Sequence, residues 1–221
     1  MNLTSDTVNV LKNFSDINQN ILIKPGNKVQ TISTMKNILA EAEVTEKFES
    51  EFAIYDLPEF LRSVEQFTKT SLNFNGGSSV KIKDVSSEQS IDYFFADKSV
   101  IVAPTKSITM PDTYASFTIK KENFEQLRKG ITNLNLPDVV VKGNGKTITL
   151  IATDKKNKSS NKYTNVIGET DKTFTAYFRA ENLKLIIDDY DVSISSQKIS
   201  HFVNRNKAIQ YWIALEPDSE F

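Results

Sequence analysis

The chain contains an internal repeat, and this repeat limits its fold more than any other feature of the sequence. FAIYDLPEFLRSV at 52–64 and FTAYFRAENLKLI at 174–186 share the pattern F-x-x-Y, two residues, Pro or Ala, Glu, any residue, Leu and a base. Three further pairs of segments follow in the same order, namely 3–11 with 119–127, 21–32 with 139–150, and 90–96 with 208–214. All four pairs are offset by 116 to 122 positions. Four ordered matches predict a duplication that gives two domains of like fold.

Each half of the chain is expected to contain helices and strands. Apolar residues at helical spacing predict helices at 5–17, 56–69, 121–134 and 180–188. Alternating polar and apolar residues predict strands at 28–35, 38–44, 71–75, 79–85, 146–153, 162–167 and 191–196. The repeat pair 21–32 and 139–150 places two β-rich runs around a Gly-containing turn, which indicates a hairpin in each half. The segment Asn75-Gly76-Gly77 indicates a further tight turn.

The domain boundaries follow from the repeat. The 221 residues suffice for two domains of ordinary size, which we expect at 1–97 and 116–221. A connector at 98–115 lies between the two copies of the repeat and contains Pro104 and Pro111. The mixture of helices and hairpins predicts an α+β fold in each domain.

Composition excludes several classes of protein. The chain has 27 basic and 28 acidic side chains, whereas a protein that coats DNA is usually basic overall. Contact with nucleic acid would therefore depend on a local separation of charge. The chain has no cysteine and one histidine, which excludes disulfides, thiol nucleophiles and Ser-His or Cys-His pairs. With neither a secretion signal nor a long apolar run, it is expected to be a soluble cytoplasmic protein.

One short motif resembles a nucleotide site but is predicted to be structural. Gly145-Lys146-Thr147 resembles the end of a phosphate-binding loop, yet the glycine required five residues earlier is replaced by Val140. A strand follows the motif, where a helix N-terminus would have to hold the phosphate. We therefore expect a hairpin turn at this position.

The remaining polar motifs also lack the pattern of a chemical site. The cluster Asp188, Asp189 and Asp191 lacks the glycine and the glutamate that a calcium loop needs, so it is expected to be a helix end and a solvated turn. His201 has no carboxylate partner near it in sequence and is expected on the surface or in a strand, and Trp212 in the core or a pocket wall. No pair of carboxylates is placed for acid–base catalysis. The sequence thus predicts no enzyme activity, no cofactor and no metal.

Three bases project opposite the apolar faces of their predicted helices, at about 100° per residue. They are Arg62, Lys69 and Lys129. A lone base in such a position is most often a solvated surface residue.

Four blocks of sequence together resemble the DNA polymerase sliding clamps of T-even-type bacteriophages. They are LTSDTVNVLKNFSDIN, FAIYDLPEFL, VIVAPTKSITMP and the terminal YWIALEPDSEF. The resemblance covers nearly the whole chain, and its most specific part is ALE-x-DS followed by a terminal Phe. It implies the DNA clamp fold, with two similar domains per chain, each with antiparallel sheets outside and two helices lining a central hole. Three such chains form a closed ring.

The resemblance also implies a function in viral DNA replication. A homotrimeric ring around duplex DNA cannot leave without opening, so it tethers the polymerase and makes synthesis processive. Its contacts to phosphate are expected to be weak and independent of sequence. The bases expected to face DNA are Lys12, Arg62, Lys69, Lys121, Arg128, Lys129 and Lys184. Ser5 stands where relatives carry a lysine, so the hole is expected to be less positive.

Two protein contacts follow from the same resemblance. A pocket near the connector is expected to receive a short apolar peptide and to consist of Val100, Ile101, Val102, Pro104, Met110, Ala214, Leu215 and Pro217. Alternatively, residues 100–102 form a strand that fills the core. Subunits are expected to pair through the strand at 90–96 and the segment 160–168. The apolar candidates there, which could instead be ordinary core, are Ile91, Tyr93, Phe95, Tyr163, Val166 and Ile167.

The partners implied are duplex DNA, the C-terminal peptide of the replicative polymerase, an ATP-dependent clamp loader and late transcription factors. The expected location is the cytoplasm of the infected bacterial host. Two other interpretations stay open from the sequence. One is a two-domain structural or binding protein of a virion. The other is an ATP-dependent DNA enzyme, which only Gly145-Lys146-Thr147 suggests.

Overall fold

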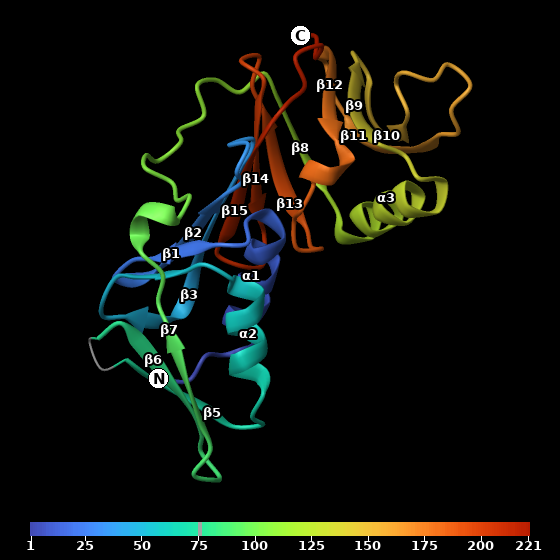
Figure 1. The fold of residues 1–221 in the computed structure, drawn as a ribbon. Coiled ribbons are helices and arrows are strands. Elements are labelled where there is room, and N and C mark those ends of the chain that lie inside the picture. Colours follow the sequence, from blue (N-terminus) through green and yellow to red (C-terminus); the bar gives the residue numbers. More distant parts are fainter. Residues whose placement is uncertain (75–76) are drawn as a thin grey trace. The chain divides into compact units, whose positions relative to one another are not determined.

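Figure 1 shows a computed structural model of the chain, which describes residues 1–74 and 77–221. The chain forms two compact units, Met1–Lys106 and Ser107–Phe221. The turn expected at Asn75-Gly76-Gly77 lies partly outside the described residues. Within the described part of the chain, the helices are too short or too polar to cross a membrane.

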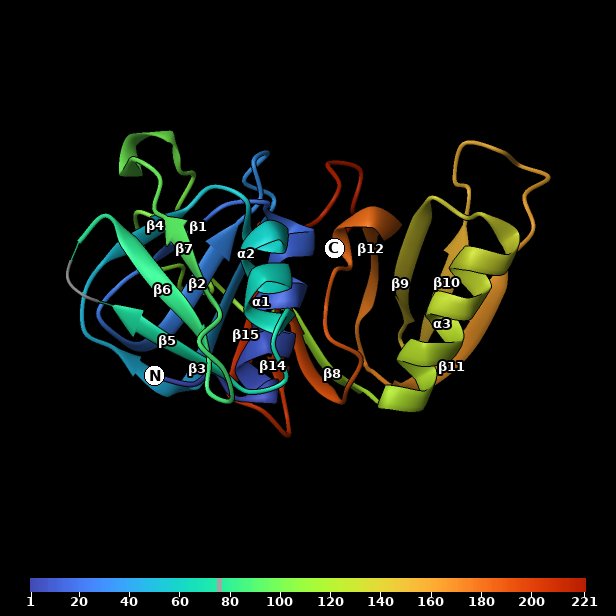
Figure 2. The same cartoon turned by 60° about the horizontal axis from the view of Figure 1, so that its bottom comes forward.

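The first unit combines two packed helices with small antiparallel sheets. In chain order it contains α1 (Ser5–Ile17), β1 (Ile21–Ile23), β2 (Gly26–Ile32), β3 (Ile38–Phe48), β4 (Phe52–Ile54), α2 (Leu57–Glu65), β5 (Thr70–Phe74), β6 (Ser79–Asp84), β7 (Ser90–Phe94) and the 3-10 turn η1 (Lys98–Val100). Strand β1 pairs with β4, β2 pairs with β3, and β5, β6 and β7 form a three-stranded sheet. Helices α1 and α2 lie side by side in Figures 1 and 2.

Capping side chains determine where α1 begins. Thr4 precedes the helix, and its hydroxyl accepts a hydrogen bond of 3.2 Å from the Thr7 N–H. The buried carboxylate of Glu46, on β3, accepts from the Thr4 N–H and the Thr7 hydroxyl, so the first turn has the partners that a helix end requires. Helix α1 has the expected bounds, and its apolar side, including Leu11 and Phe14, is buried.

Helix α2 is shorter than expected. Asp56 caps it by accepting from the Glu59 N–H at 2.8 Å, and the helix ends at Glu65 instead of continuing to 69. The Thr70 hydroxyl donates to the carbonyl of Val64 at 2.7 Å, which replaces the backbone donor that one more helical turn would supply. The prediction for 66–69 was therefore wrong.

The hairpin expected at 21–32 was also wrong. Its two runs are strands, but β1 pairs with β4 and β2 pairs with β3. The turn that forms instead lies at 33–37, where the Ser33 hydroxyl accepts from the N–H groups of Asn37 and Ile38. This hydroxyl fixes the reversal between β2 and β3, so the long strand β3 becomes the partner of β2.

The second unit consists of antiparallel sheets and one α-helix. In chain order it contains β8 (Ala115–Ile119), α3 (Lys121–Leu134), β9 (Asp138–Asn144), β10 (Thr147–Thr153), β11 (Tyr163–Glu169), β12 (Thr173–Arg179), the 3-10 turn η2 (Ala180–Asn182), β13 (Tyr190–Ile194), β14 (Ile199–Asn204) and β15 (Ile209–Ala214). One sheet has the order β11-β10-β9-β12, and β15, β14, β13 and β8 pair in that order. In Figure 2, α3 runs across one face of the sheet formed by β9, β10 and β11.

An aromatic cluster fills the interior of the second unit. Tyr190 is 1% exposed, and its ring lies 6.1 to 6.3 Å from the rings of Phe124, Phe202 and Tyr211. Its hydroxyl donates to the carbonyl of Ile186 at 2.8 Å. Burial raises the pKa of Tyr190 to about 12, so the hydroxyl keeps its proton and continues to donate.

The helix expected at 180–188 was wrong, because only the turn η2 forms there. The Tyr211 hydroxyl accepts from the Ile186 N–H at 3.3 Å, while the Tyr190 hydroxyl donates to the Ile186 carbonyl. These side chains supply the hydrogen bonds that helical neighbours would otherwise make. Leu183 and Leu185 are both buried, which is the period of two that extended chain shows.

We predict that Leu127→Ala lowers the free energy of unfolding by about 2 to 5 kcal/mol, because it empties a filled core position. Leu127 is 1% exposed on α3, whereas Leu134, on the same helix, is 41% exposed. Urea denaturation at one fixed protein concentration measures the loss. The matched control, Leu134→Ala, should cost about 1 kcal/mol or less. Equal losses in the two variants would contradict the packing of α3.

Candidate nucleic-acid interface

The bases of the first unit lie among acidic side chains. Arg62 is exposed on α2, as predicted, but Lys69 lies beyond the end of that helix, so its expected place on a helical face was wrong. Lys12 of α1 forms an ion pair with Glu65 of α2, with 2.6 Å between Nζ and Oε1. Together, α1 and α2 contain two more acids than bases.

The second unit presents a more positive helix. Lys121, Arg128 and Lys129 are exposed on α3, which contains one more base than acids. The carboxylate of Asp189 accepts from the Lys121 N–H at 2.7 Å and so caps the helix. Lys184 is half-buried in the segment after η2 and therefore does not lie on a helix. A polyanion would meet a weak field on these surfaces, strongest along α3.

Each unit has an outer strand where the sequence predicts a subunit contact. Strand β7 is an outer strand of β5-β6-β7, and β11 is an outer strand of β11-β10-β9-β12. The Phe95 N–H donates to the carbonyl of Ser78, in line with β6. Because antiparallel pairing alternates, Asp92 and Phe94 direct their backbone groups away from β6. The edge of β7 therefore presents hydrogen-bonding groups to a further strand.

The most exposed apolar side chains on these strands are Phe94, at 70%, and Val166, at 59%. Phe94 was missed from the sequence, which pointed to its half-buried neighbours Ile91, Tyr93 and Phe95. Exposed and half-buried residues alternate strictly along β7, and this alternation places the Phe94 side chain on the exposed face of the strand.

Tyr93 connects β7 to α2 within its own unit. Its hydroxyl donates to the carbonyl of Asp56 at 3.1 Å, and its ring lies 5.2 Å from that of Phe60. Burial, followed by the charges of Glu59 and Asp56, raises the pKa of Tyr93 to about 12. Tyr93 therefore holds the edge strand against the helix that carries Arg62.

We call the sheet β11-β10-β9-β12 the large sheet of the second unit. Its other outer strand, β12, already has a partner. Thr175 and Glu220 exchange two backbone hydrogen bonds of 2.9 Å each. The Tyr177 N–H donates to the Ser219 hydroxyl at 3.0 Å. The C-terminal tail thus lies along β12 and satisfies part of its edge, which leaves β11 as the outer strand without such a cover in the described part of the unit.

Helix α3 and strand β11 approach each other closely. A Cβ atom placed on Gly130 of α3 would lie 2.9 Å from both Cβ and Cγ of Tyr163. The Asn165 amide donates to the side-chain oxygen of Asn123 on α3, at 2.9 Å. Tyr163 therefore packs within its own unit, and only a glycine at position 130 allows this distance.

The start of the connector is bound to the first unit. The Asn18 amide donates to the Val102 carbonyl at 3.2 Å, and the side-chain oxygen of Asn20 accepts from the Val102 N–H at 3.0 Å. Val100 is 53% exposed in the turn η1, so residues 100–102 do not form a strand that fills the core, and that alternative was wrong.

The other residues expected in the peptide pocket differ in exposure. They include buried Pro104 and Leu215, half-buried Ile101, Met110 and Ala214, and exposed Pro217. These residues are divided between the two units, so the pocket stays a prediction.

Known protein families match both halves of the chain. The family described as DNA polymerase processivity factor matches residues 4–103, and the family described as gp45 sliding clamp, C terminal, matches residues 116–217. The sliding clamp of Vibrio phage KVP40 is 32% identical over 223 residues, which cover 98% of this chain and 99% of the relative. The chain belongs to the phage DNA polymerase sliding clamps. The sliding clamp of Enterobacteria phage T4 is 28% identical and covers 99% of this chain and 98% of its own length.

Solved structures share the clamp fold at lower identity. A chain of the PCNA2–PCNA3 complex from Sulfolobus tokodaii has a TM-score of 0.70 at 13% identity and covers 97% of this clamp and 98% of its own length. The PCNA of Thermococcus kodakaraensis has a TM-score of 0.68 at 12% identity, with 96% of each chain covered. The clamp fold inferred from the sequence is confirmed, and the interpretations as a virion protein or an ATP-dependent enzyme have no support.

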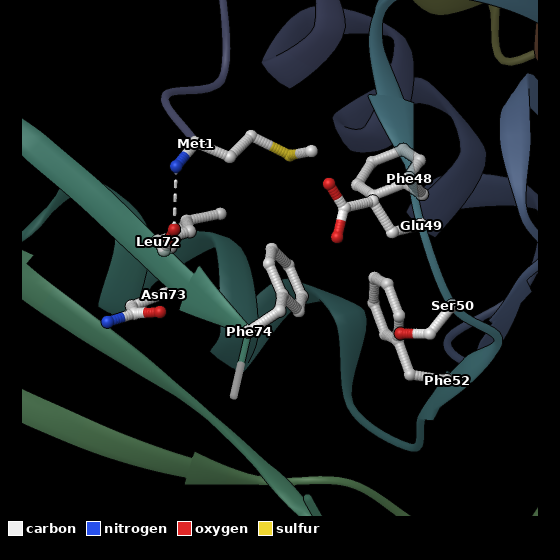
Figure 3. A pocket seen from close by; sticks show the side chains of 8 residues that line it. All are labelled: Met1, Phe48, Glu49, Ser50, Phe52, Leu72, Asn73 and Phe74. Atoms are coloured by element: carbon white, nitrogen blue, oxygen red, sulfur yellow. Dashed lines mark hydrogen bonds between the residues drawn. The ribbon is translucent and has the colours of Figure 1, made fainter. Parts of the chain in front are cut away.

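The clamp also has a pocket of about 480 Å³ in its first unit, shown in Figure 3. Its apolar wall is formed by Phe48, Phe52 and Phe74, whose ring centroids lie 5.0 to 6.4 Å apart. The other lining residues are Met1, Glu49, Ser50, Leu72 and Asn73. This lining suits an apolar side chain and contains no pair of groups suited to proton transfer.

The motifs that resembled chemical sites are structural in the clamp. Gly145 has a φ of 79° in the turn between β9 and β10, so the predicted hairpin is confirmed. His201 of β14 stacks on Trp212 with 4.6 Å between the ring centroids, and burial lowers its pKa. Among residues 1–74 and 77–221, no group of three or more His, Cys, Asp and Glu side chains could hold a metal ion.

We predict that Ser195→Ala raises the pKa of Asp112, a connector residue in the second unit. The Ser195 hydroxyl, followed by the N–H and hydroxyl of Ser196, donates to the Asp112 carboxylate and lowers its pKa. Because the folded pKa is lowered, this anchor stabilises the clamp above the ordinary aspartate pKa. The stabilisation is lost as the pH falls through the folded value.

A carboxyl titration followed by NMR measures this change. Asp97 is the internal control, because the N–H of Ser99 lowers its pKa independently. An unchanged Asp112 titration in the Ser195→Ala variant would show that the anchor does not act as described.

Proposed function

We propose that three copies of this clamp close into a ring around duplex DNA and hold the replicative polymerase on its template. The observation that supports the proposal is the outer strand that each unit presents, β7 in the first and β11 in the second. A head-to-tail contact between these strands is heterologous, and such contacts form a closed ring when the rotation between subunits allows it. The exposed side chains of Phe94 and Val166 would be buried in this contact.

The helices would line the hole of the ring. The bases proposed to meet phosphate are Lys12, Arg62, Lys69, Lys121, Arg128, Lys129 and Lys184. Acidic residues lie among them, and Lys12 is already paired with Glu65. The hold on any one phosphate is therefore weak, which allows the ring to slide, while closure of the ring prevents its loss.

The remaining partners are proposals that rest on membership of the sliding clamp family. A peptide of the polymerase, and late transcription factors, would dock in the pocket beside the connector. An ATP-dependent loader would open and close the ring in the cytoplasm of the infected bacterium. In this role the clamp needs no cofactor and performs no chemistry, since its effect is to keep the polymerase at a high local concentration.

We predict that the clamp, once loaded, is retained on circular duplex DNA and is released when the circle is cut once. A topological link needs an intact circle, and free ends let the ring slide off. Gel filtration of the loaded complex before and after cutting measures the retained fraction. Blocking both ends of the cut DNA with bound protein is the control, and it should restore retention. A clamp that stays on cut, unblocked DNA would be binding by contact alone.

We predict that the double variant Arg62→Glu with Lys129→Glu lowers processive synthesis at least several-fold while the trimer still forms. Both residues are exposed on helices, one in each unit, so the reversal places six additional acids near phosphate in a trimer. Primer extension with the cognate polymerase and loader measures the effect, and light scattering measures the assembly.

The matched control for this variant is Lys47→Glu with Lys146→Glu. These lysines are exposed on β3 and in the turn between β9 and β10, so the control changes the net charge equally without changing a helix. Equal loss of synthesis in the two double variants would show that net charge, and not the helical surface, is what matters.

A further inference from the structure

The second unit has a hollow of about 450 Å³ on the face of its large sheet that points away from α3. Along β11, Tyr163 and Asn165 contact α3, whereas Thr164, between them, lines the hollow. Because side chains alternate along a strand, α3 and the hollow lie on opposite faces of the sheet. The hollow is lined by Val140, Lys142, Ile151, Thr153, Asp154, Lys155, Asn157, Lys158, Lys162, Thr164, Thr175, Tyr177 and Glu220.

Positive charge gathers around this hollow. The ion pairs found among the described residues leave Lys142, Lys158 and Lys162 uninvolved, and all three are exposed. The fourth lysine, Lys155, is fixed by an ion pair of 2.8 Å with Asp218 and lies 4.7 Å over the ring of Tyr177. Three exposed ammonium groups outside these ion pairs therefore lie around one that is held in place.

The floor of the hollow is apolar and contains a hydroxyl without a partner. Val140, Ile151 and Tyr177 stand side by side on paired strands and give this floor an apolar centre. Thr153 is only 7% exposed, and its Oγ1 has no hydrogen-bond partner within the described chain. Strand alternation places Thr153 on the same face as Ile151. A buried hydroxyl without a hydrogen-bond partner lowers the stability of the fold unless a ligand forms the missing hydrogen bond.

The walls of the hollow are ordered by their own hydrogen bonds. On one side, the loop 154–162 is fixed by the Asp154 N–H, which donates to the Ser160 hydroxyl at 3.0 Å, and by the Ser160 N–H, which donates to the Asn157 carbonyl at 3.0 Å. On the other side, the tail is paired with β12 through Glu220. The hollow thus exists before any ligand arrives, which lowers the entropic cost of binding.

We propose that this hollow is a docking site for an acidic peptide segment of a partner protein, with one apolar side chain on the floor and carboxylates on the surrounding lysines. The site shares no lining residue with the peptide pocket beside the connector. Carboxylate complements the lysines, and the Thr153 hydroxyl supplies a donor to the peptide. The rim acids Asp154 and Glu220 can accept from the backbone N–H groups of an extended peptide.

The dimensions of the hollow also favour a peptide over duplex DNA. A volume of about 450 Å³ accommodates a few side chains and lies at the lower end of the range for ligand pockets. The aromatic ring of Tyr177, covered by Lys155, is not open to stacking by a base.

The test uses the full chain and a fluorescent peptide of about ten residues, composed of Asp and Glu with one central leucine. Fluorescence anisotropy should show saturable binding that weakens with added salt. In the double variant Lys142→Gln, Lys158→Gln, binding should weaken about fourfold, since an exposed ion pair is worth about a factor of two. Replacing the leucine by serine should also weaken binding.

The matched control is the double variant Lys24→Gln, Lys47→Gln, which removes two exposed lysines of the first unit. It should bind the peptide like the wild type. Equal weakening in both double variants, or no binding by the wild type, would overturn the proposal. Equally strong binding of single-stranded DNA of about ten nucleotides would overturn it in favour of nucleic acid.

Two further measurements separate docking from structure. Thr153→Val keeps the shape of the side chain and removes the hydroxyl, so peptide binding should weaken several-fold while the melting temperature of the peptide-free clamp stays the same or rises. Light scattering should show the same oligomeric state for the lysine double variant and the wild type. If Thr153→Val raises the melting temperature and leaves peptide binding unchanged, the hydroxyl is only an unsatisfied buried group and not part of a binding site. If the lysine variant changes its oligomeric state, the lysines belong to a contact between copies of the chain.

Discussion

Backbone N–H and C=O groups along the outer strand of a sheet need hydrogen-bond partners, and this requirement organises both units of the clamp. In the large sheet of the second unit, the tail occupies the edge of β12 through Thr175 and Glu220. In the first unit, Met1 and Leu72 exchange backbone hydrogen bonds of 2.7 and 2.8 Å at the edge of β5. Within these two sheets, the opposite outer strands β11 and β7 are available for a further strand. Covering one edge of each sheet therefore leaves the other edge to join subunits.

The sequence correctly predicted helices that depend on interactions between residues a few positions apart. The helices at 5–17 and 121–134 were predicted with their observed bounds, because their periodic apolar faces agree with local signals such as Thr4. The helix at 180–188 could not be excluded, because the hydroxyl that replaces its backbone bonding comes from Tyr211, 25 positions beyond Ile186. A pattern of neighbouring residues contains no information about such a distant acceptor. Tyr211 itself lies in the repeated segment 208–214, so the expected helix is replaced through packing between two repeated segments of the second copy.

The candidate DNA surface was predictable in part for the same reason. Helical angles identified Arg62 and Lys129 as exposed bases, and both are. The angles could not show that Glu65 binds Lys12, because 53 positions separate them and only the packing of α1 on α2 brings them together. The exposed Phe94 was overlooked because apolar character alone does not distinguish an inward from an outward position. The electrostatic potential of the helical surface thus depends on tertiary packing, although every charged residue is known from the sequence.

The contact between Gly130 and Tyr163 has a mechanical consequence. At Gly130, α3 and β11 lie too close together to leave room for a Cβ atom. Independent sliding or tilting of the helix and the strand would therefore produce a steric clash. The edge strand β11 and the helix that carries Arg128 and Lys129 are therefore expected to move together. A force that pulls on this edge would also act on α3, so separation of the edge from a neighbouring strand would displace these charges.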